Sequence, residues 1–228
     1  MITGLKGIVV PVVTPFDESE HFSPMAMREI IDHLIDQGVH AIFVAGSVGE
    51  FYALDADELR EVVRVAVDAV GGRVPVVAGT GAIDTRRAVQ LSRTAEELGV
   101  DALSVLTPFY VQPNEEELYQ HYCAIMKAVA IPVLGYTNPG RTGGATLSPT
   151  LIGRLHREFD HFAGIKDSSG NLTLLKEYKA ACPEPFWVFT GLDTIIYDAV
   201  LNDAAGGVAG LANIAPRIAV SVYQDALD

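Results

Sequence analysis

Two patterns of apolar residues alternate along the chain. Short, continuous runs of Val, Ile, Leu and Ala are separated by longer segments in which apolar residues recur every three or four positions. A short continuous run predicts a strand that is buried on both faces, as in a parallel sheet, and the longer periodicity predicts an amphipathic helix. The predicted strands are residues 8–14, 40–46, 74–80, 101–107, 131–136, 162–166, 186–191 and 206–211.

Polar residues that commonly cap helices stand in front of the longer segments. Ser23 and Ser148 each precede a proline, which is favoured at the first helical position, and Asp55 with Glu58 forms a predicted capping box. These residues predict where three of the helices begin. The other predicted caps are Asp84, Asn114, Asn171 and Asp193.

A strand and a helix recur once in roughly 25 to 35 residues, which is the spacing of βα units. Eight such units predict a single (β/α)8 TIM barrel that occupies residues 1–228 as one catalytic domain. An open doubly wound sheet is the alternative, although it usually has fewer strands. The last predicted helix runs to residue 228 without a stop signal, which favours a chain that is truncated at the C-terminus.

Composition narrows the class of partner. A net charge of -13 and a pI near 4.8 argue against nucleic acid and against an anionic membrane, because both require a basic face. No targeting segment and no apolar stretch long enough to span a bilayer is evident in the sequence. Cys123 and Cys182 lie far apart in helix-like segments, so we expect reduced core cysteines and a cytoplasmic protein.

In a parallel barrel the active site forms where strands end, so the residues just after each apolar run are the candidates. Lys166, in the stretch GIKDSSG, is the first of them. An amine enclosed by apolar neighbours loses hydration, which lowers its pKa, and a neutral amine can attack a ketone to form an imine. The alternative interpretation is a lysine that ends a strand with its head group in water.

Two other strand ends offer groups that fit this chemistry. Tyr136 ends the adjacent strand, where its phenol can exchange protons with the amine. Ser47, in the turn GSVGE, offers a hydroxyl for a proton relay, and the backbone N–H groups of this turn, including that of Gly49, can hold a carboxylate. Arg141 lies in a stiff Pro-Gly-Arg-Thr-Gly loop and suits a second carboxylate. Each is a weak signal alone.

Taken in order, GSVGE, TPFYVQP, YTNPGRTG and GIKDSSGNL resemble the dihydrodipicolinate synthase and N-acetylneuraminate lyase family of pyruvate-dependent class I aldolases. The resemblance covers essentially the whole chain. It implies that Lys166 forms a Schiff base with pyruvate or another 2-oxo acid and that Tyr136 is the general acid and base. It also implies that Ser47 and Tyr110 extend a proton relay.

The resemblance further implies a homodimer or a homotetramer, because in many relatives the tyrosine that matches Tyr110 comes from a neighbouring subunit. Arg141 would receive the carboxylate of an acidic aldehyde, and Val48, Gly49 and Val208 would contact the substrate. Neither a metal nor another cofactor is expected, because the protonated imine replaces a Lewis acid.

Three features depart from the family's pattern. Val48 stands where members commonly have a threonine whose hydroxyl helps to bind the pyruvate carboxylate. Thr137 and Asn138 follow Tyr136, where the synthase pattern has an asparagine directly after the tyrosine. The usual helical extension after the barrel is not evident in the sequence. In the family this extension is expected to contribute to the closing of the site and to the quaternary structure.

Three functions remain open at this point. The leading one is a Schiff-base-forming lyase or synthase that condenses or cleaves a pyruvate unit with an aldehyde. The second is an aldolase or dehydratase of 2-oxo-3-deoxy sugar acids, favoured by Val48 if the carboxylate pocket is rebuilt. The third is a barrel that binds a 2-oxo acid without turning it over, but such a site gains little from a desolvated amine beside a phenol.

Overall fold

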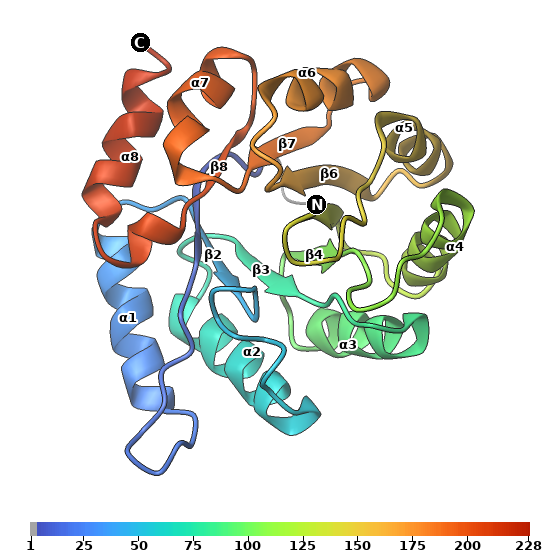
Figure 1. The fold of residues 1–228 in the computed structure, drawn as a ribbon. Coiled ribbons are helices and arrows are strands. Elements are labelled where there is room, and N and C mark those ends of the chain that lie inside the picture. Colours follow the sequence, from blue (N-terminus) through green and yellow to red (C-terminus); the bar gives the residue numbers. More distant parts are fainter. Residues whose placement is uncertain (1–3) are drawn as a thin grey trace.

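The computed structural model describes residues 4–228, and within this range eight parallel strands form a closed barrel. The strands follow one another in chain order, and β8 pairs with β1 to close the ring (Figure 1). The predicted TIM barrel is confirmed, and the open doubly wound sheet is wrong. The strands are β1 (Gly7–Pro11), β2 (Ala41–Val44), β3 (Val76–Gly79), β4 (Ala102–Leu106), β5 (Val133–Thr137), β6 (Phe162–Asp167), β7 (Trp187–Thr190) and β8 (Gly206–Val208).

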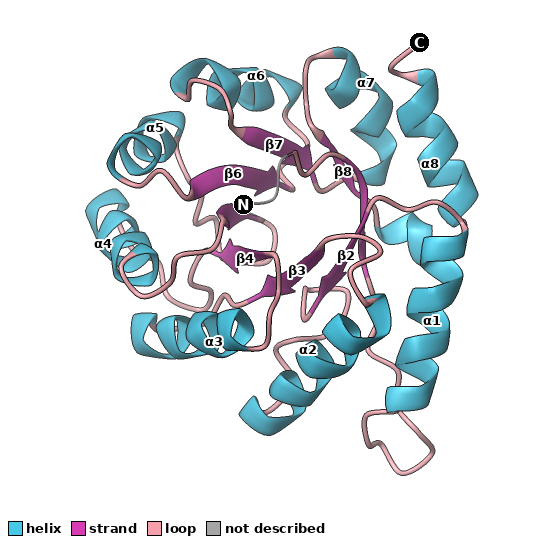
Figure 2. Cartoon of the chain, turned by 180° about the vertical axis from the view of Figure 1, so that it is seen from behind, coloured by secondary structure: helices cyan, strands magenta, loops and turns pink. Residues whose placement is uncertain are grey.

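The helices surround the barrel, as the view from behind also shows (Figure 2). Each follows the strand of the same number, and none within residues 4–228 is long and apolar enough to cross a membrane. The helices are α1 (Pro24–Asp36), α2 (Ala56–Val70), α3 (Thr85–Glu97), α4 (Glu115–Met126), α5 (Pro149–Glu158), α6 (Leu172–Ala181), α7 (Ile196–Leu201) and α8 (Pro216–Asp225), with short 3-10 helices at η1 (Asp193–Ile195) and η2 (Gly210–Asn213).

Most of the predicted caps hold the helix starts. The side chains that accept hydrogen bonds from first-turn N–H groups are those of Ser23, Asp55, Asp84, Asn114, Ser148 and Asn171. The prediction for Asp193 is wrong, because a 3-10 turn separates this residue from α7, which begins without a side-chain cap. Instead, Oδ1 of Asp193 accepts a hydrogen bond from the N–H of Leu211 at 3.0 Å, which ties the loop after β7 to the loop after β8.

The alternation of side chains along each strand creates two apolar layers. In β2, Phe43 points into the barrel, whereas Ile42 and Val44 pack in the layer between strands and helices. Both layers are apolar, which explains why the strands read as continuous apolar runs. The inner layer consists of Leu5, Val9, Ala41, Phe43, Val77, Ala102, Leu134, Phe189 and Val208.

The register between β5 and β6 shifts by one residue near the start of β6. Val133 is opposite Phe162, but Leu134 is opposite Gly164, so β6 carries one extra residue. Beyond the shift, Tyr136 lies directly opposite Lys166. Phe162 belongs to the outer layer, and the Lys166 side chain contacts the inward-facing Phe43. The extra residue therefore separates an outward-facing start of the strand from an inward-facing end.

Candidate active site

The Lys166 amine lies inside the barrel near the carboxyl end of β6. The residue is only 5% exposed, and Nζ lies 5.0 Å from the centre of the Phe43 ring. Burial lowers the pKa of this amine, although the Tyr136 phenol and the Asp193 carboxylate oppose the shift by favouring the charged form. The predicted dry lysine at a strand end is therefore present, and the reading of a lysine with its head group in water is wrong.

The Tyr136 ring lies beside this amine, with 4.1 Å between Nζ of Lys166 and the ring centre. Burial alone would raise the pKa of Tyr136, but the charge of Lys166 and hydrogen bonds to neighbouring side chains outweigh it, so the pKa is lowered. One of these bonds is donated by Nδ2 of Asn138 to the phenol oxygen at 3.0 Å. The pKa values of the amine and of the phenol are thus both lowered from their ordinary values, which brings both groups nearer to the neutral pH at which they would exchange protons.

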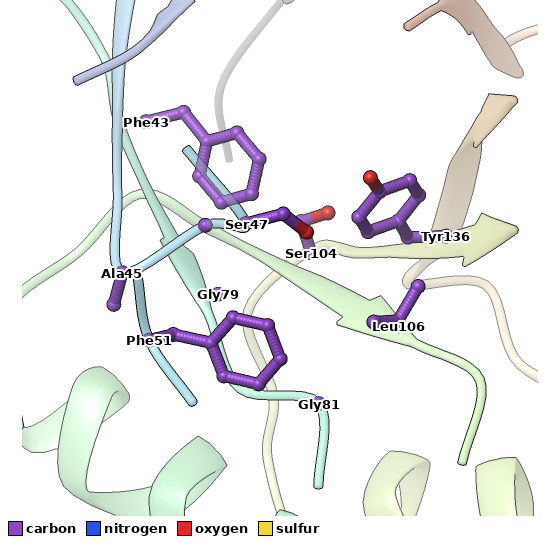
Figure 3. A pocket seen from close by; sticks show the side chains of 10 residues that line it. Phe43, Ala45, Ser47, Phe51, Gly79, Gly81, Ser104, Leu106 and Tyr136 are labelled. Carbon is purple, nitrogen blue, oxygen red and sulfur yellow. The ribbon is translucent and has the colours of Figure 1, made fainter. Parts of the chain in front are cut away.

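Ser47 brings a hydroxyl from the β2–α2 loop to the same place. It lines a small pocket together with Ser104 and Tyr136 (Figure 3). The Ser47 oxygen is buried and has no hydrogen bond of ordinary geometry within the described residues, yet it lies close enough to Tyr136 to help lower the pKa of the phenol. A buried hydroxyl without a partner retains its capacity to accept or pass a proton.

The loop that carries Ser47 lies closely against the segment that follows β1. A Cβ atom at Gly49 would lie 2.8 Å from the carbonyl oxygen of Val12, so a larger residue would not fit there. The hydroxyl of Thr14 donates to the Gly49 carbonyl at 2.6 Å and fixes the turn. Gly49 is buried in this contact and does not line the pocket, whereas the adjacent Val48 does.

A pocket of about 280 Å³ opens at the carboxyl ends of the strands. It brings together most of the residues predicted from the sequence: Ser47, Val48, Tyr136, Arg141, Lys166 and Val208. The pocket is therefore lined by a buried amine, a phenol and a hydroxyl and by the guanidinium of an exposed arginine.

Tyr110, like Gly49, is a predicted site residue that lies outside this pocket. Its side chain is 93% exposed, and its backbone adopts φ 72°, in the left-handed region that bulky residues seldom occupy. The exposed side chain has little packing of its own to hold this conformation. A strained backbone of this kind persists only where its surroundings hold it.

Seven pocket residues were not identified from the sequence as site residues: Pro11, Asn138, Ser168, Gly191, Leu192, Asp193 and Gly210. Gly191 leaves room for the lysine, because a Cβ atom there would overlap Oγ of Ser168 and lie 3.0 Å from Cε of Lys166. The signal for Ser168 was its place in the turn directly after Lys166, and the signal for Gly191 was a glycine directly after a predicted strand.

No group of three or more His, Cys, Asp or Glu side chains within residues 4–228 could hold a metal ion. Cys123 and Cys182 are buried and free, in agreement with the expected reduced core cysteines. The polar groups that line the site are the lysine amine, the phenol, the hydroxyls of Ser47 and Ser168, the Asn138 amide, the Asp193 carboxylate and the guanidinium.

A buried lysine beside a tyrosine at the carboxyl end of a closed (β/α)8 barrel is the arrangement expected of a class I aldolase, which works through a lysine Schiff base. Within this class, residues 4–228 match the model of the dihydrodipicolinate synthetase family, and the chain belongs to that family. Its members are pyruvate-dependent lyases and synthases, and the chain is an enzyme of this type.

Individual relatives agree with the family assignment. The 4-hydroxy-tetrahydrodipicolinate synthase of Methylococcus capsulatus is 37% identical over 223 residues, which are 98% of this chain and 76% of that protein. The crystal structure of dihydrodipicolinate synthase from Aquifex aeolicus superposes with a TM-score of 0.95 at 31% identity and covers 98% of this chain and 75% of that one. The enzyme from Acinetobacter baumannii, solved in complex with pyruvate, gives a TM-score of 0.93 at 35% identity over 97% of this chain and 76% of that one.

Proposed function

We propose that this enzyme forms a Schiff base between Lys166 and pyruvate and uses it to join the pyruvate unit to an aldehyde, or to reverse that reaction. The observation that carries the proposal is the lysine amine held dry inside the barrel, 4.1 Å from the centre of the Tyr136 ring. The pyruvate complex of the A. baumannii relative supports a small 2-oxo acid as the first substrate.

The first step needs a neutral amine, and burial of Lys166 supplies it by lowering the pKa. The nitrogen attacks the keto carbon, and the carbinolamine loses water to give an imine. Tyr136 moves protons between nitrogen and oxygen during this exchange, and Ser47 passes them on. Loss of a proton from the methyl carbon of the protonated imine then gives a neutral enamine, because the electrons of the broken C–H bond are taken up through the imine nitrogen, and the enamine carbon attacks the aldehyde.

The rim of the pocket favours an aldehyde that carries a carboxylate. The guanidinium of Arg141 is exposed at the rim, in the loop directly after β5, and can bind a carboxylate through two parallel hydrogen bonds. Val48 and Val208 add apolar wall on the side of β2 and β8. With no hydroxyl at Val48, the pyruvate carboxylate is held by Ser47 and by backbone N–H groups of its loop.

A sugar-acid aldolase or dehydratase is the second candidate, and specific side chains favour it. Asn138, Ser168 and Asp193 all line the pocket around the lysine, and each can bind a substrate hydroxyl. A 2-oxo-3-deoxy sugar acid would present hydroxyls to this wall, and the imine at Lys166 would support either cleavage or loss of water. A barrel that binds a 2-oxo acid without turnover is the third candidate, since the same pocket can hold the acid.

Assembly into a homodimer or homotetramer would give Tyr110 a function. Alone, this side chain is almost fully exposed, and in a dimer it would enter the relay of the neighbouring site. Sedimentation over a range of protein concentrations, run beside activity assays, tests this part of the proposal. Activity that stays constant while the protein dissociates to monomers would contradict a role for Tyr110 across subunits.

Borohydride reduction in the presence of pyruvate tests the central proposal. A stable adduct on Lys166, located by mass spectrometry of peptides, is the expected result, and the Lys166→Ala variant should give none. A screen of acidic aldehydes and of 2-oxo-3-deoxy sugar acids, followed by pyruvate consumption or release, separates the two enzymatic candidates. Adduct formation without turnover of any of them would favour the binding barrel, and absence of the adduct would overturn the Schiff base.

A further inference from the structure

We infer that Asn138 is a positioning residue, which fixes the direction of the hydrogen bonds at the Tyr136 hydroxyl and connects this hydroxyl to the loop that carries Arg141. The inference rests on the proposed function, because it gives Asn138 a part in the proton transfers at Lys166. Neither the family resemblance nor the comparisons assign a role to this residue.

The side-chain bond sets the direction. Nδ2 of Asn138 donates to the phenol oxygen of Tyr136 at 3.0 Å, so this oxygen acts as an acceptor there. An amide nitrogen can only donate, which means that the phenol's own proton must point elsewhere. The Ser47 oxygen, buried and without another partner in the described part of the chain, is the open acceptor on the same pocket wall. While the phenol is protonated, the order of donors is thus Asn138, Tyr136, Ser47, and once the phenol is ionised the Ser47 hydroxyl can turn and donate to it.

The backbone of the same residue anchors the loop. Its carbonyl accepts hydrogen bonds from the N–H of Arg141 at 2.9 Å, from the N–H of Thr142 at 3.1 Å and from the Thr142 hydroxyl at 3.0 Å. Thr142 is fully buried, so this end of the loop is fixed to the barrel. One residue therefore contacts the phenol with its side chain and orients the arginine with its main chain.

The charged groups around Tyr136 determine how much the uncharged Asn138 amide contributes to lowering the pKa of the phenol. Lys166 faces the phenol from β6, and Arg141 and Asp193 share the pocket from the loops after β5 and β7. Tyr122 approaches from α4 on the other side of the strand, where burial raises its pKa and keeps it neutral. Lys166 and the bonds from Ser47, Asn138 and Ser168 lower the pKa of Tyr136 against the effect of burial. Removing the Asn138 donor should weaken that effect without removing it.

Two variants of Asn138 and one control test the inference. Asn138→Val removes the donor, and the isosteric Asn138→Asp replaces it by an acceptor, so both should raise the pKa of Tyr136. Thr142→Val is the matched control, because it loosens the loop but leaves the Asn138 amide intact. The phenolate of Tyr136 is followed by ultraviolet absorbance during a pH titration, with Tyr136→Phe as the blank, and imine formation is followed by the rate of borohydride trapping with pyruvate.

The expected midpoint for the phenolate rises by about one pH unit in Asn138→Val and by more in Asn138→Asp, with about a tenfold slower trapping at neutral pH. Thr142→Val should leave the midpoint unchanged and weaken only the use of an acidic aldehyde. An unchanged midpoint in both Asn138 variants would overturn the inference, even when the wild-type adduct forms. Absence of the wild-type adduct would instead overturn the proposed function, and the titration still reports on the hydrogen bond by itself.

Discussion

Buried tyrosines occur in two regions of this barrel, and the pKa of the phenol is shifted in opposite directions in the two regions. In the layer between strands and helices, burial raises the pKa of Tyr122 and of Tyr178. Each of these hydroxyls donates to a main-chain carbonyl at 2.7 Å, from Val105 and Leu147 respectively. Inside the barrel, Tyr136 is as deeply buried, but its pKa is lowered by Lys166 and by hydrogen-bonding neighbours.

The difference shows what makes a buried ionisable group reactive. The tyrosine hydroxyls lose hydration in both regions, and this loss by itself only favours the neutral form of the phenol. A hydroxyl whose proton is committed to a carbonyl has a structural role, because transferring that proton would leave the carbonyl unsatisfied. A hydroxyl that accepts from Asn138 and faces an amine can give up its proton and take it back.

The largest effect is expected when the amine itself is removed. Lys166→Ala should lower turnover by roughly 10⁴-fold or more, because the covalent step has no other nucleophile in the pocket. The fold should survive, since the side chain lies at a strand end near the pocket and fills little core volume. Lys176→Ala, on the exposed face of α6, is the control for loss of a lysine. Circular dichroism and pyruvate consumption are the measurements, and retained activity would contradict the assignment.

Matched tyrosine variants test the comparison directly. Tyr136→Phe should lower turnover by about 10²- to 10⁴-fold with little change in stability. Tyr122→Phe should do the reverse, leaving turnover nearly unchanged and destabilising the fold by about 1–3 kcal/mol, because the Val105 carbonyl loses its donor. Kinetic assays give the turnover of each variant, and urea unfolding gives the free energy of unfolding of each. Similar losses of turnover in the two variants would remove the distinction between the regions.

A narrower loss is expected at the rim. Arg141→Ala should lower the use of an acidic aldehyde by about 10- to 100-fold, because one charge-assisted contact is lost. Imine formation with pyruvate should persist, since Arg141 lies at the exposed edge of the pocket and away from the amine. Turnover assays and borohydride trapping are compared on the same sample. Equal loss in both assays would assign a structural role to this arginine.

The smallest effect concerns a buried histidine in the outer layer. Burial lowers the pKa of His121 to about 4, while Nδ1 lies 2.9 Å from the Thr85 hydroxyl. In the unfolded chain this histidine takes up a proton near the ordinary imidazole pKa of 6.5, so the unfolded chain binds more protons than the folded chain between these two values. The free energy of unfolding should therefore fall as the pH decreases from 6.5 toward 4.

Between pH 7 and 4.5 this single group should account for about 2 kcal/mol. Urea unfolding of the wild type and of His121→Gln at both pH values measures it, because groups shared by the two proteins cancel in the comparison. Turnover near neutral pH should not depend on this residue, in contrast to Tyr136. An equal pH dependence in both proteins would exclude His121 as its source.

Much of the fold could be predicted from the sequence because local rules and tertiary packing agree. Continuous apolar runs are what strands between two apolar layers require, and most helix starts carry a capping side chain. Asp193 was misassigned, because an acidic residue ahead of a helical segment resembles a cap whether or not the helix starts there. Its actual partner, the Leu211 N–H, comes from a distant part of the chain.

Site residues could be predicted where an ionisable side chain directly ends a predicted strand, as for Lys166 and Tyr136. Asn138 and Ser168 were missed because amides and hydroxyls are common in turns, and only the register between neighbouring strands shows which of them faces the amine. Gly191 carries no chemical group at all, so its contribution, the space beside the lysine, is visible only in three dimensions.

The additional residue in β6 has a consequence for the whole chemistry. Phe162 and Lys166 are an even number of positions apart, and in an unbroken strand both would face the same way. Because the register shifts between them, the Phe162 side chain packs in the layer between strands and helices, whereas the Lys166 amine points into the barrel. If the same residues were paired without this shift, every side chain downstream of Phe162 would face the other way, and the amine would leave the cavity with every functional side chain still encoded.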